Sequence, residues 1–453
     1  MNLQVWCEWA WLGDPTAASG VLLHIEGDRI TSVRTAVAAP PAGSEVLAGL
    51  TLPGIANAHS HAFHRVLRGR TQVGGGSFWT WRQQMYAAAA QLTPALYHQL
   101  AIAVFSEMVT AGYTAVGEFH YVHHQPDGSP YAQAHEMEFA LVDAARVAGI
   151  RLTLLDTCYL HGGIGQPLAS TQLRFSDGSV EAWVARVSAL ADAVGNGPLV
   201  RVGAAIHSVR AVTPAEASVV AAWASDRRVP LHAHVSEQRL ENEQCMDAYG
   251  ATPTSVLEAA GVLRRAGGFC AVHATHLSDD DVRAYGSALA FVCLCPTTER
   301  DLADGIGPSV ALRDAGARLC IGSDSHAVLD PFEELRAVEL DERLSTGVRG
   351  SHGSAQLLAA GTANGMAALG WPDAGRMAEG AQADLVCVRL DGVQLAGVAP
   401  AHVLESVLYA GGPHDVESVM VGGRFVVRHG VHQSVGDVAA RLRESIGAIV
   451  DEL

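Results

Sequence analysis

The sequence predicts an α/β protein: a (β/α)8 TIM-like barrel with a small β-sandwich domain built from both chain ends. Three observations lead to this prediction. Apolar, β-rich runs alternate with helical segments through the middle of the chain, whereas both ends contain short strands joined by turns. Histidines and carboxylates also recur at the carboxyl ends of the central runs. That end of a barrel carries the active site.

The central β runs number eight, as a closed barrel requires. They are "GLTLPGI", "GYTAVGEFHY", "RLTLLDTCYL", "LVRVGAAIHS", "PLHAHVSE", "GFCAVHATHL", "LAFVCLCP" and "ARLCIGSDS". Two intervening helices are predicted to start at Thr93-Pro94 and Thr213-Pro214, a threonine cap followed by proline in the first turn. Alternation alone also permits an open doubly wound sheet, but no strand-linked GxGxxG or Walker loop supports nucleotide binding.

The chain ends have hairpin patterns. "VLLHIEGDRITSV" places two apolar strands around a Gly-Asp turn, and "VESVMVGGRFVVRHG" does the same across Gly-Gly. "ADLVCVRLDG" is a further strand. We therefore expect residues 1–52 and 375–453, the latter with a terminal helix, to form the small β domain, and residues 53–374 to form the barrel.

Composition narrows the possible partners and chemistry. With 453 residues, 49% hydrophobic and a net charge of −17, the chain can bury a large core and is a poor ligand for nucleic acid or anionic membranes. All 30 basic residues are arginine, so Schiff-base chemistry and a carbamylated lysine bridging two metals are excluded. The eight cysteines lack zinc spacing and are expected in the core of a reduced, cytoplasmic protein. No signal peptide or membrane span is predicted.

The polar residues at the strand ends suit a divalent metal. His59 and His61 alternate, so both face the same side of a strand. One histidine of the pair His232 and His234, together with Asp324, would complete a ligand set that lowers the pKa of a bound water to about 7. Spacing alone does not choose between His232 and His234. Other candidates at strand ends are Glu118, His120, His207, Glu237, His273 and His276.

Four segments carry a family resemblance. "PGIANAHSHAFHR", "HAHVSE", "VHATHL" and "IGSDSH" resemble the amidohydrolase superfamily, in particular its deaminase branch with one metal. That branch lacks the bridging lysine, in agreement with the composition. "SFWTWRQQMY", "GEFHYVHH" and "IHSVRAV" further resemble the formimidoylglutamate deiminase family of histidine degradation, and the likeness covers nearly the whole chain.

The resemblance implies a set of roles. The metal ligands would be His59, His61, His234 and Asp324. Glu237 would shuttle protons, His273 would lie beside the attacking water, and Asp324 would also take a proton from it. Zinc is the expected metal, with iron or manganese as alternatives. The family also suggests a homodimer.

The implied reaction is the hydrolysis of N-formimino-L-glutamate to N-formyl-L-glutamate and ammonia. This small anionic substrate has two carboxylates, which arginine can bind bidentately. The resemblance assigns substrate contacts to His64, Arg82, Tyr121, His207 and Arg210. Residue 64 is commonly glutamine in that family. A glycine-rich stretch, residues 74–76, is predicted to be a mobile loop that carries Arg82 over the pocket.

Three alternatives remain open from the sequence. A related deaminase could act on a guanine-like or triazine ring, which predicts aromatic and amide groups in place of the two arginines. Cleavage to formamide and glutamate is a second possibility. The third is a non-catalytic scaffold, although such a protein would be expected to lose metal ligands, and here all four are present.

Overall fold

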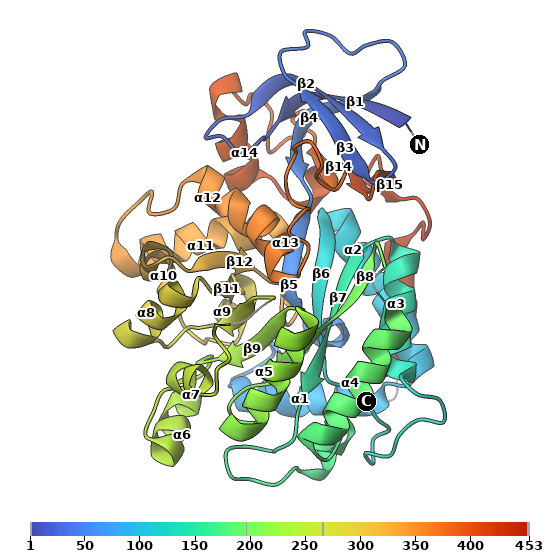
Figure 1. The fold of residues 1–453 in the computed structure, drawn as a ribbon. Helices are drawn as coiled ribbons and strands as arrows, with labels where there is room; N and C mark the ends of the chain where they lie inside the picture. The colour runs from blue at the N-terminus through green and yellow to red at the C-terminus, as the bar shows by residue number, and fades with distance from the viewer. Residues whose placement is uncertain (1, 196, 265–266, 451–453) are drawn as a thin grey trace.

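The computed structural model describes residues 2–195, 197–264 and 267–450. It contains two sheets of eight strands each, one parallel and one mixed, placed one above the other in Figure 1. The parallel sheet forms the barrel and the mixed sheet forms the small β domain from both chain ends. The predicted fold class is therefore confirmed. Residues 1 and 451–453, the ends of the predicted domain ranges, lie outside the described residues.

The barrel strands correspond to the eight predicted runs and pair in chain order. They are β5 (Ile55–Ser60), β6 (Tyr113–His120), β7 (Arg151–Cys158), β8 (Val200–Ile206), β9 (Leu231–Val235), β10 (Phe269–His273), β11 (Phe291–Leu294) and β12 (Arg318–Ile321). The last strand meets the first through hydrogen bonds from Asp324 N to His59 O (3.0 Å) and from His61 N to Asp324 O (3.2 Å). The barrel thus closes through the backbone of predicted metal ligands.

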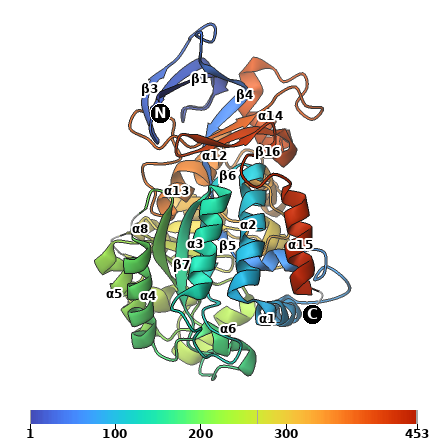
Figure 2. The ribbon, with the colours of Figure 1, turned by 90° about the vertical axis from the view of Figure 1, so that its right-hand side faces the viewer.

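Helices cover the outside of the barrel (Figures 1 and 2). The Thr93 side chain caps α2 by accepting from Leu96 N, and Thr213 caps α5 in a capping box with Glu216, as the threonine-proline pattern predicts. The α-helices of the barrel region are α1 (Phe78–Gln91), α2 (Pro94–Ala111), α3 (Glu136–Ala148), α4 (Val180–Val194), α5 (Pro214–Arg227), α6 (Arg239–Tyr249), α7 (Pro253–Ala259), α8 (Asp279–Ala288), α9 (Pro296–Asp301), α10 (Ser309–Ala315) and α11 (Pro331–Thr346).

The chain after α11 closes the amino-terminal end of the barrel. Here α12 (Ser354–Ala359) and α13 (Gly365–Ala368) lead to Trp371, whose indole donates to Thr153 Oγ1 at the start of β7 (3.0 Å). His232 Nε2 bonds the Ala368 carbonyl at 3.0 Å. His232 therefore holds the segment from α12 to Trp371, called the plug below. This contact lies away from the carboxyl ends of the strands.

The small domain has strand order β16-β15-β14-β13-β4-β1-β2-β3. Its strands are β1 (Asn2–Ala10), β2 (Ala18–Glu26), β3 (Arg29–Arg34), β4 (Glu45–Pro53), β13 (Leu385–Val388), β14 (Val416–Val421), β15 (Arg424–Arg428) and β16 (Val431–His432). The two chain ends meet where β4 pairs antiparallel with β13. Both hairpins form as predicted, and Val5, Leu23, Leu385 and Met420 share one buried core.

Two further α-helices lie in the C-terminal part of the described chain. Helix α14 (Val403–Ala410) lies beside the small domain, and α15 (Val438–Val450) lies along α2 of the barrel (Figure 2). The predicted terminal helix is thus present, but it packs on the barrel. Within the described ranges, no helix combines the length and the apolar character needed to cross a membrane.

Candidate metal centre and active site

The site lies at the carboxyl ends of the barrel strands, around a small cavity. His59 is on β5, His61 directly follows it, His234 is on β9, and Asp324 follows β12. These side chains come from the first, fifth and eighth strands of the barrel. The cavity is lined by His61, His64, Phe78, Trp81, Arg82, Met85, Tyr121, His207, Arg210, His234, Glu237, Leu302 and Asp324.

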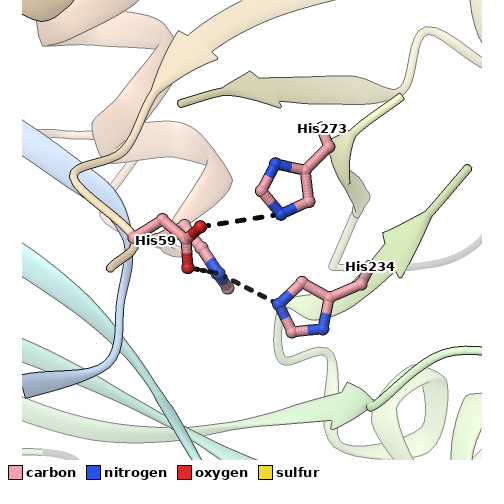
Figure 3. Close-up of side chains that lie close together, drawn as sticks. His59, His234 and His273 are labelled. Carbon is pink, nitrogen blue, oxygen red and sulfur yellow. Dashed lines mark hydrogen bonds and ion pairs between the residues drawn. The ribbon is translucent and has the colours of Figure 1, made fainter. Parts of the chain in front are cut away.

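Four side chains converge on one point. His59 Nε2 and His61 Nε2 lie 3.2 and 3.4 Å from Asp324 Oδ1. His234 Nε2 lies 3.1 Å from His59 Nε2 and 3.4 Å from His61 Nε2. A tetrahedral ion with ligands at about 2.0 Å separates its ligands by about 3.3 Å. The spacing of these four groups therefore fits one divalent ion, and Figure 3 shows His59 and His234 pointing into this common space.

The protonation pattern also fits a metal. His61 Nδ1 bonds the Phe119 carbonyl and His234 Nδ1 bonds the His207 carbonyl, both at 2.9 Å. Because a carbonyl only accepts, each Nδ1 carries the hydrogen and each Nε2 keeps its lone pair for the ion. Burial lowers the pKa of His59 and His234, and lowers the pKa of His61 to about 3. Neutral imidazoles with facing lone pairs are the donors that zinc prefers.

Backbone strain gathers at the same strand ends. Ser236, His273 and Asp324 have left-handed φ angles of 52°, 69° and 42°. Such angles are costly for residues with a side chain and persist where surrounding contacts impose them. At Asp324 the imposing contacts are its backbone bonds to β5, which aim the carboxylate at the histidines.

His273 and Glu237 lie beside the four ligands. His273 Nε2 is 3.8 Å from both Asp324 Oδ2 and Glu237 Oε1, and Nδ1 is 3.3 Å from Glu299 Oε1. Burial by itself lowers the pKa of His273, but the carboxylates of Glu237, Glu299 and Asp324 outweigh burial and raise it to about 10. With Glu299 beside Nδ1, His273 directs Nε2 toward Asp324 and Glu237, from where it can donate a hydrogen bond.

The predicted substrate contacts form the rest of the wall. Arg82 Nη2 donates to Tyr159 Oη (3.0 Å), and Arg210 Nη2 contacts Glu237 Oε2 (3.2 Å). His64 Nε2 and Tyr121 Oη are 3.1 Å apart, and the Tyr121 and His207 rings are in edge contact. The structure thus places the five predicted substrate contacts, together with Glu237, His61, His234 and Asp324, on the cavity wall. The predicted site residues His59 and His273 do not line the cavity and lie behind it, beside Asp324. Arg82 reaches the cavity from α1, which follows the glycine-rich stretch.

Three candidates from the sequence, Glu118, His120 and His276, do not line the cavity. Glu118 accepts hydrogen bonds from Ser60 Oγ and Ala62 N, and His120 stacks on Tyr97 of α2. Both alternate with Phe119, whose ring packs on His59 and His234. They therefore face the helix layer instead of the cavity. His276 is partly exposed and does not line the cavity.

Several side chains that contact the site were missed by sequence reasoning. Tyr159, directly after β7, positions Arg82, and Glu299 of α9 contacts His273. Glu241 of α6 is fully buried 3.7 Å from Arg210 Nε. Tyr159 has the same strand-end signal as the predicted residues. Glu241 and Glu299 lie on helices and carry no such signal.

The barrel, the converging histidines and the aspartate define a metal-dependent hydrolase of the TIM-barrel class. The amidohydrolase family matches residues 50–426, and the chain belongs to this family. The predicted superfamily is therefore confirmed.

Relatives of known identity agree with this placement. Formimidoylglutamate deiminase of Pseudomonas aeruginosa is 40% identical over 96% of this chain and 95% of its own length. The 8-oxoguanine deaminase of the same organism is 27% identical over 97% and 99%.

Solved structures share the whole architecture. An amidohydrolase from Brucella melitensis superposes with a TM-score of 0.91 and 32% identity, covering 99% of this chain and 100% of that one. An adenosine deaminase from Xanthomonas campestris with bound zinc gives a TM-score of 0.86 at 24% identity, covering 100% and 98%, a likeness of fold alone.

Proposed function

We propose that this protein hydrolyses N-formimino-L-glutamate to N-formyl-L-glutamate and ammonia. The observation that carries the proposal is the presence of Arg82 and Arg210 on the wall of the cavity that also holds the four metal-type ligands. Two guanidinium groups match a substrate with two carboxylates. Among the residues that the structure describes, the cavity lining contains no asparagine or glutamine for reading a purine or triazine edge. The 40% identity to a formimidoylglutamate deiminase supports the same substrate.

The ion would be held by His59, His61, His234 and Asp324, and when bound it would act as a Lewis acid on water and the reacting carbon. Asp324 Oδ2, which faces His273, accepts a proton from the attacking water. His273 donates to the oxygen that becomes the formyl oxygen. Glu237 delivers a proton to the former imino nitrogen, and Asp324 passes on the water proton that it accepted, so this nitrogen carries three hydrogens when it leaves. The hydroxyl proton of the tetrahedral intermediate restores the proton of Glu237. The carbon–nitrogen bond then breaks, ammonia leaves, and the other nitrogen becomes the amide of the formyl product.

The substrate contacts follow from the wall. Arg82 and Arg210 bind the two carboxylates, while Tyr121, His207 and His64 supply hydrogen bonds between them. His64 offers one ring nitrogen where the related family has an amide. Its Nε2 contacts Tyr121 Oη, and no hydrogen bond of the described residues involves its Nδ1. His64 can therefore still donate to a bound carboxylate. Closure of the stretch at residues 74–76 over the ligand remains part of the proposal.

The test is ammonia release by the metal-loaded enzyme from N-formimino-L-glutamate compared with guanine. Product identification separates N-formylglutamate from formamide. Arg210→Ala should lower kcat/KM by roughly 30-fold or more, because a buried carboxylate loses a bidentate partner. This corresponds to a loss of about 2 kcal/mol of transition-state stabilisation. Arg146→Ala is the matched control, since Arg146 pairs with Asp143 on the surface of α3. Faster turnover of guanine would overturn the proposal.

We further propose zinc as the metal, a homodimer as the assembly and the cytoplasm as the location. The histidine-rich ligand set supports zinc. The eight free, buried cysteines suit a reducing compartment. Metal analysis of protein purified without added metal, sedimentation analysis and cell fractionation test the three statements separately.

A further inference from the structure

Arg210 has an unusual set of partners for a substrate-binding arginine. Its side chain is 6% exposed and already engaged on two sides. On the Nε side, Ser208 Oγ lies at 3.2 Å and Glu241 Oε2 at 3.7 Å. On the other side, Nη2 donates to Glu237 Oε2 at 3.2 Å. Glu237 is the proposed proton donor, so the carboxylate-binding group and the proton-transfer group are bonded to each other.

The Nε side of Arg210 is a fixed anchor. Ser208 follows β8, and Glu241 lies fully buried in the first turn of α6, so neither can retreat into solvent. The Phe78 ring lies 5.4 Å from the guanidinium carbon and covers it from α1. A ligand in the cavity therefore meets Arg210 at its outer edge, formed by Nη1 and Nη2.

A bidentate carboxylate on that edge needs a hydrogen bond from each outer nitrogen. Nη2 is the nitrogen that donates to Glu237. The substrate carboxylate and Glu237 therefore compete for the same donor. On its other side, Glu237 Oε1 lies 3.8 Å from His273 Nε2, so His273 is a nearby partner for the side chain when Oε2 is displaced.

We propose that the Arg210–Glu237 ion pair is a latch that the substrate carboxylate opens, freeing Glu237 to reach the imino nitrogen. Glu241 and Ser208 keep Arg210 in place while Glu237 leaves. The latch makes the carboxylate that Arg210 binds a requirement for proton transfer as well as for binding. Amidines without that carboxylate leave Glu237 paired and react slowly even when bound. This inference rests on the proposed function.

The kinetic test uses N-propylformamidine, which has the amidine and an alkyl chain but neither carboxylate. In the wild-type enzyme the latch stays closed, and kcat should fall at least about 100-fold below that for N-formimino-L-glutamate. Arg210→Gln removes the latch and should raise kcat on N-propylformamidine at least about tenfold above wild type. Arg82→Gln removes the same charge from the same wall without touching Glu237, because Arg82 contacts Tyr159. The gain should be at least about tenfold larger in Arg210→Gln than in Arg82→Gln.

A second measurement does not depend on variants. A crystal structure of the metal-loaded wild-type enzyme with N-formyl-L-glutamate should show the carboxylate on Arg210 and Glu237 Oε2 moved beyond hydrogen-bond distance. A bound carboxylate with the Arg210–Glu237 bond intact overturns the latch, as does equal behaviour of the two variants. If the wild-type enzyme releases no ammonia from N-formimino-L-glutamate, the proposed function fails and the latch fails with it. If the wild-type enzyme turns over N-formimino-L-glutamate but Arg210→Gln does not raise kcat on N-propylformamidine, the latch is contradicted and the proposed function stands.

Discussion

Two buried clusters of histidines and carboxylates lie at the strand ends, yet they are built for different tasks. The first is the metal centre. The second, the Arg186 cluster, lies between β6, β7 and the helices outside them, and consists of His120, His123, Glu138, Asp156, Asp177 and Arg186. In both, imidazole and carboxylate atoms lie close enough to share an ion.

The difference is the counter-charge. Arg186 contacts Glu138 at 3.1 Å, Asp156 at 2.8 Å and Asp177 at 2.7 Å, so a guanidinium already lies where the three carboxylates of this cluster meet. Among the described residues, no arginine pairs with Asp324. An ion bound beside Arg186 would be repelled, whereas the metal centre needs a cation to hold its ligands together. Histidine and carboxylate near a strand end therefore do not define a metal site until the neighbouring charges are known.

The largest contrast is expected from removing one histidine of each cluster. His234→Ala should abolish stoichiometric metal binding and lower kcat/KM by roughly 10⁴-fold, because the ion loses one of four ligands. His123→Ala should keep one ion per chain. Elemental analysis and ammonia-release kinetics measure both. Loss of metal in His123→Ala would break the comparison, since the Arg186 cluster would then take part in metal binding.

The next effect concerns stability. Arg186→Gln leaves the buried carboxylates of Glu138 and Asp156 without their partner, and should lower the free energy of unfolding by about 3–5 kcal/mol. Urea denaturation measures it. Arg227→Gln, which breaks a surface pair with Asp192, is the control and should cost at most about 1 kcal/mol. A second ion bound by Arg186→Gln would sharpen the comparison, because the guanidinium alone would then exclude metal.

A smaller effect on catalysis is expected from the Glu299–His273 pair beside the metal centre. Glu299→Gln removes the charge beside His273 Nδ1 and should lower kcat/KM by about tenfold while the metal content stays unchanged. Steady-state kinetics on metal-replete protein test it, with the surface variant Glu258→Gln as control. Unchanged kcat/KM would show that Glu299 serves the fold of α9 and not His273.

The smallest effect is the pH dependence of stability in the metal-free protein. Burial lowers the pKa of His61 from 6.5 to about 3, so below pH 6.5 the unfolded chain takes up a proton that the folded protein refuses. The free energy of unfolding should therefore fall between pH 6.5 and 3, by up to about 1.4 kcal/mol per pH unit for each such histidine.

His123 should act in the opposite sense. Burial and Arg186 oppose its charge, but Asp156 and Glu138 outweigh them and raise its pKa above 6.5. Its contribution is full below pH 6.5 and is lost as pH rises through the raised pKa. Urea denaturation in the presence of a chelator should show a flatter acid limb for His61→Asn and a flatter alkaline limb for His123→Asn. The same change in both variants would contradict the assignment.

Sequence reasoning predicted the eight barrel strands, both hairpins and the capped helices, because these depend on local periodicity and turn chemistry. It also predicted that His59, His61 and Asp324 follow strands that meet at one end of a barrel. Spacing left His232 and His234 equivalent, since both lie on the same face of β9, and only the family resemblance chose His234. The two differ in their position along the barrel axis. His232 bonds the plug at the amino-terminal end, whereas His234 faces His59 at the carboxyl end of β5.

The sequence by itself determined which residue types stand at the strand ends, because strand alternation and the short distance from strand to loop are local properties. The tertiary structure decided which of them face the cavity and which charges meet there. Glu118 and His120 face α2, and Arg186 of α4 supplies the cation beside a second histidine cluster. Glu241 reached Arg210 from a helix. These contacts depend on strand rotation and helix packing across tens to hundreds of residues, which no local pattern records.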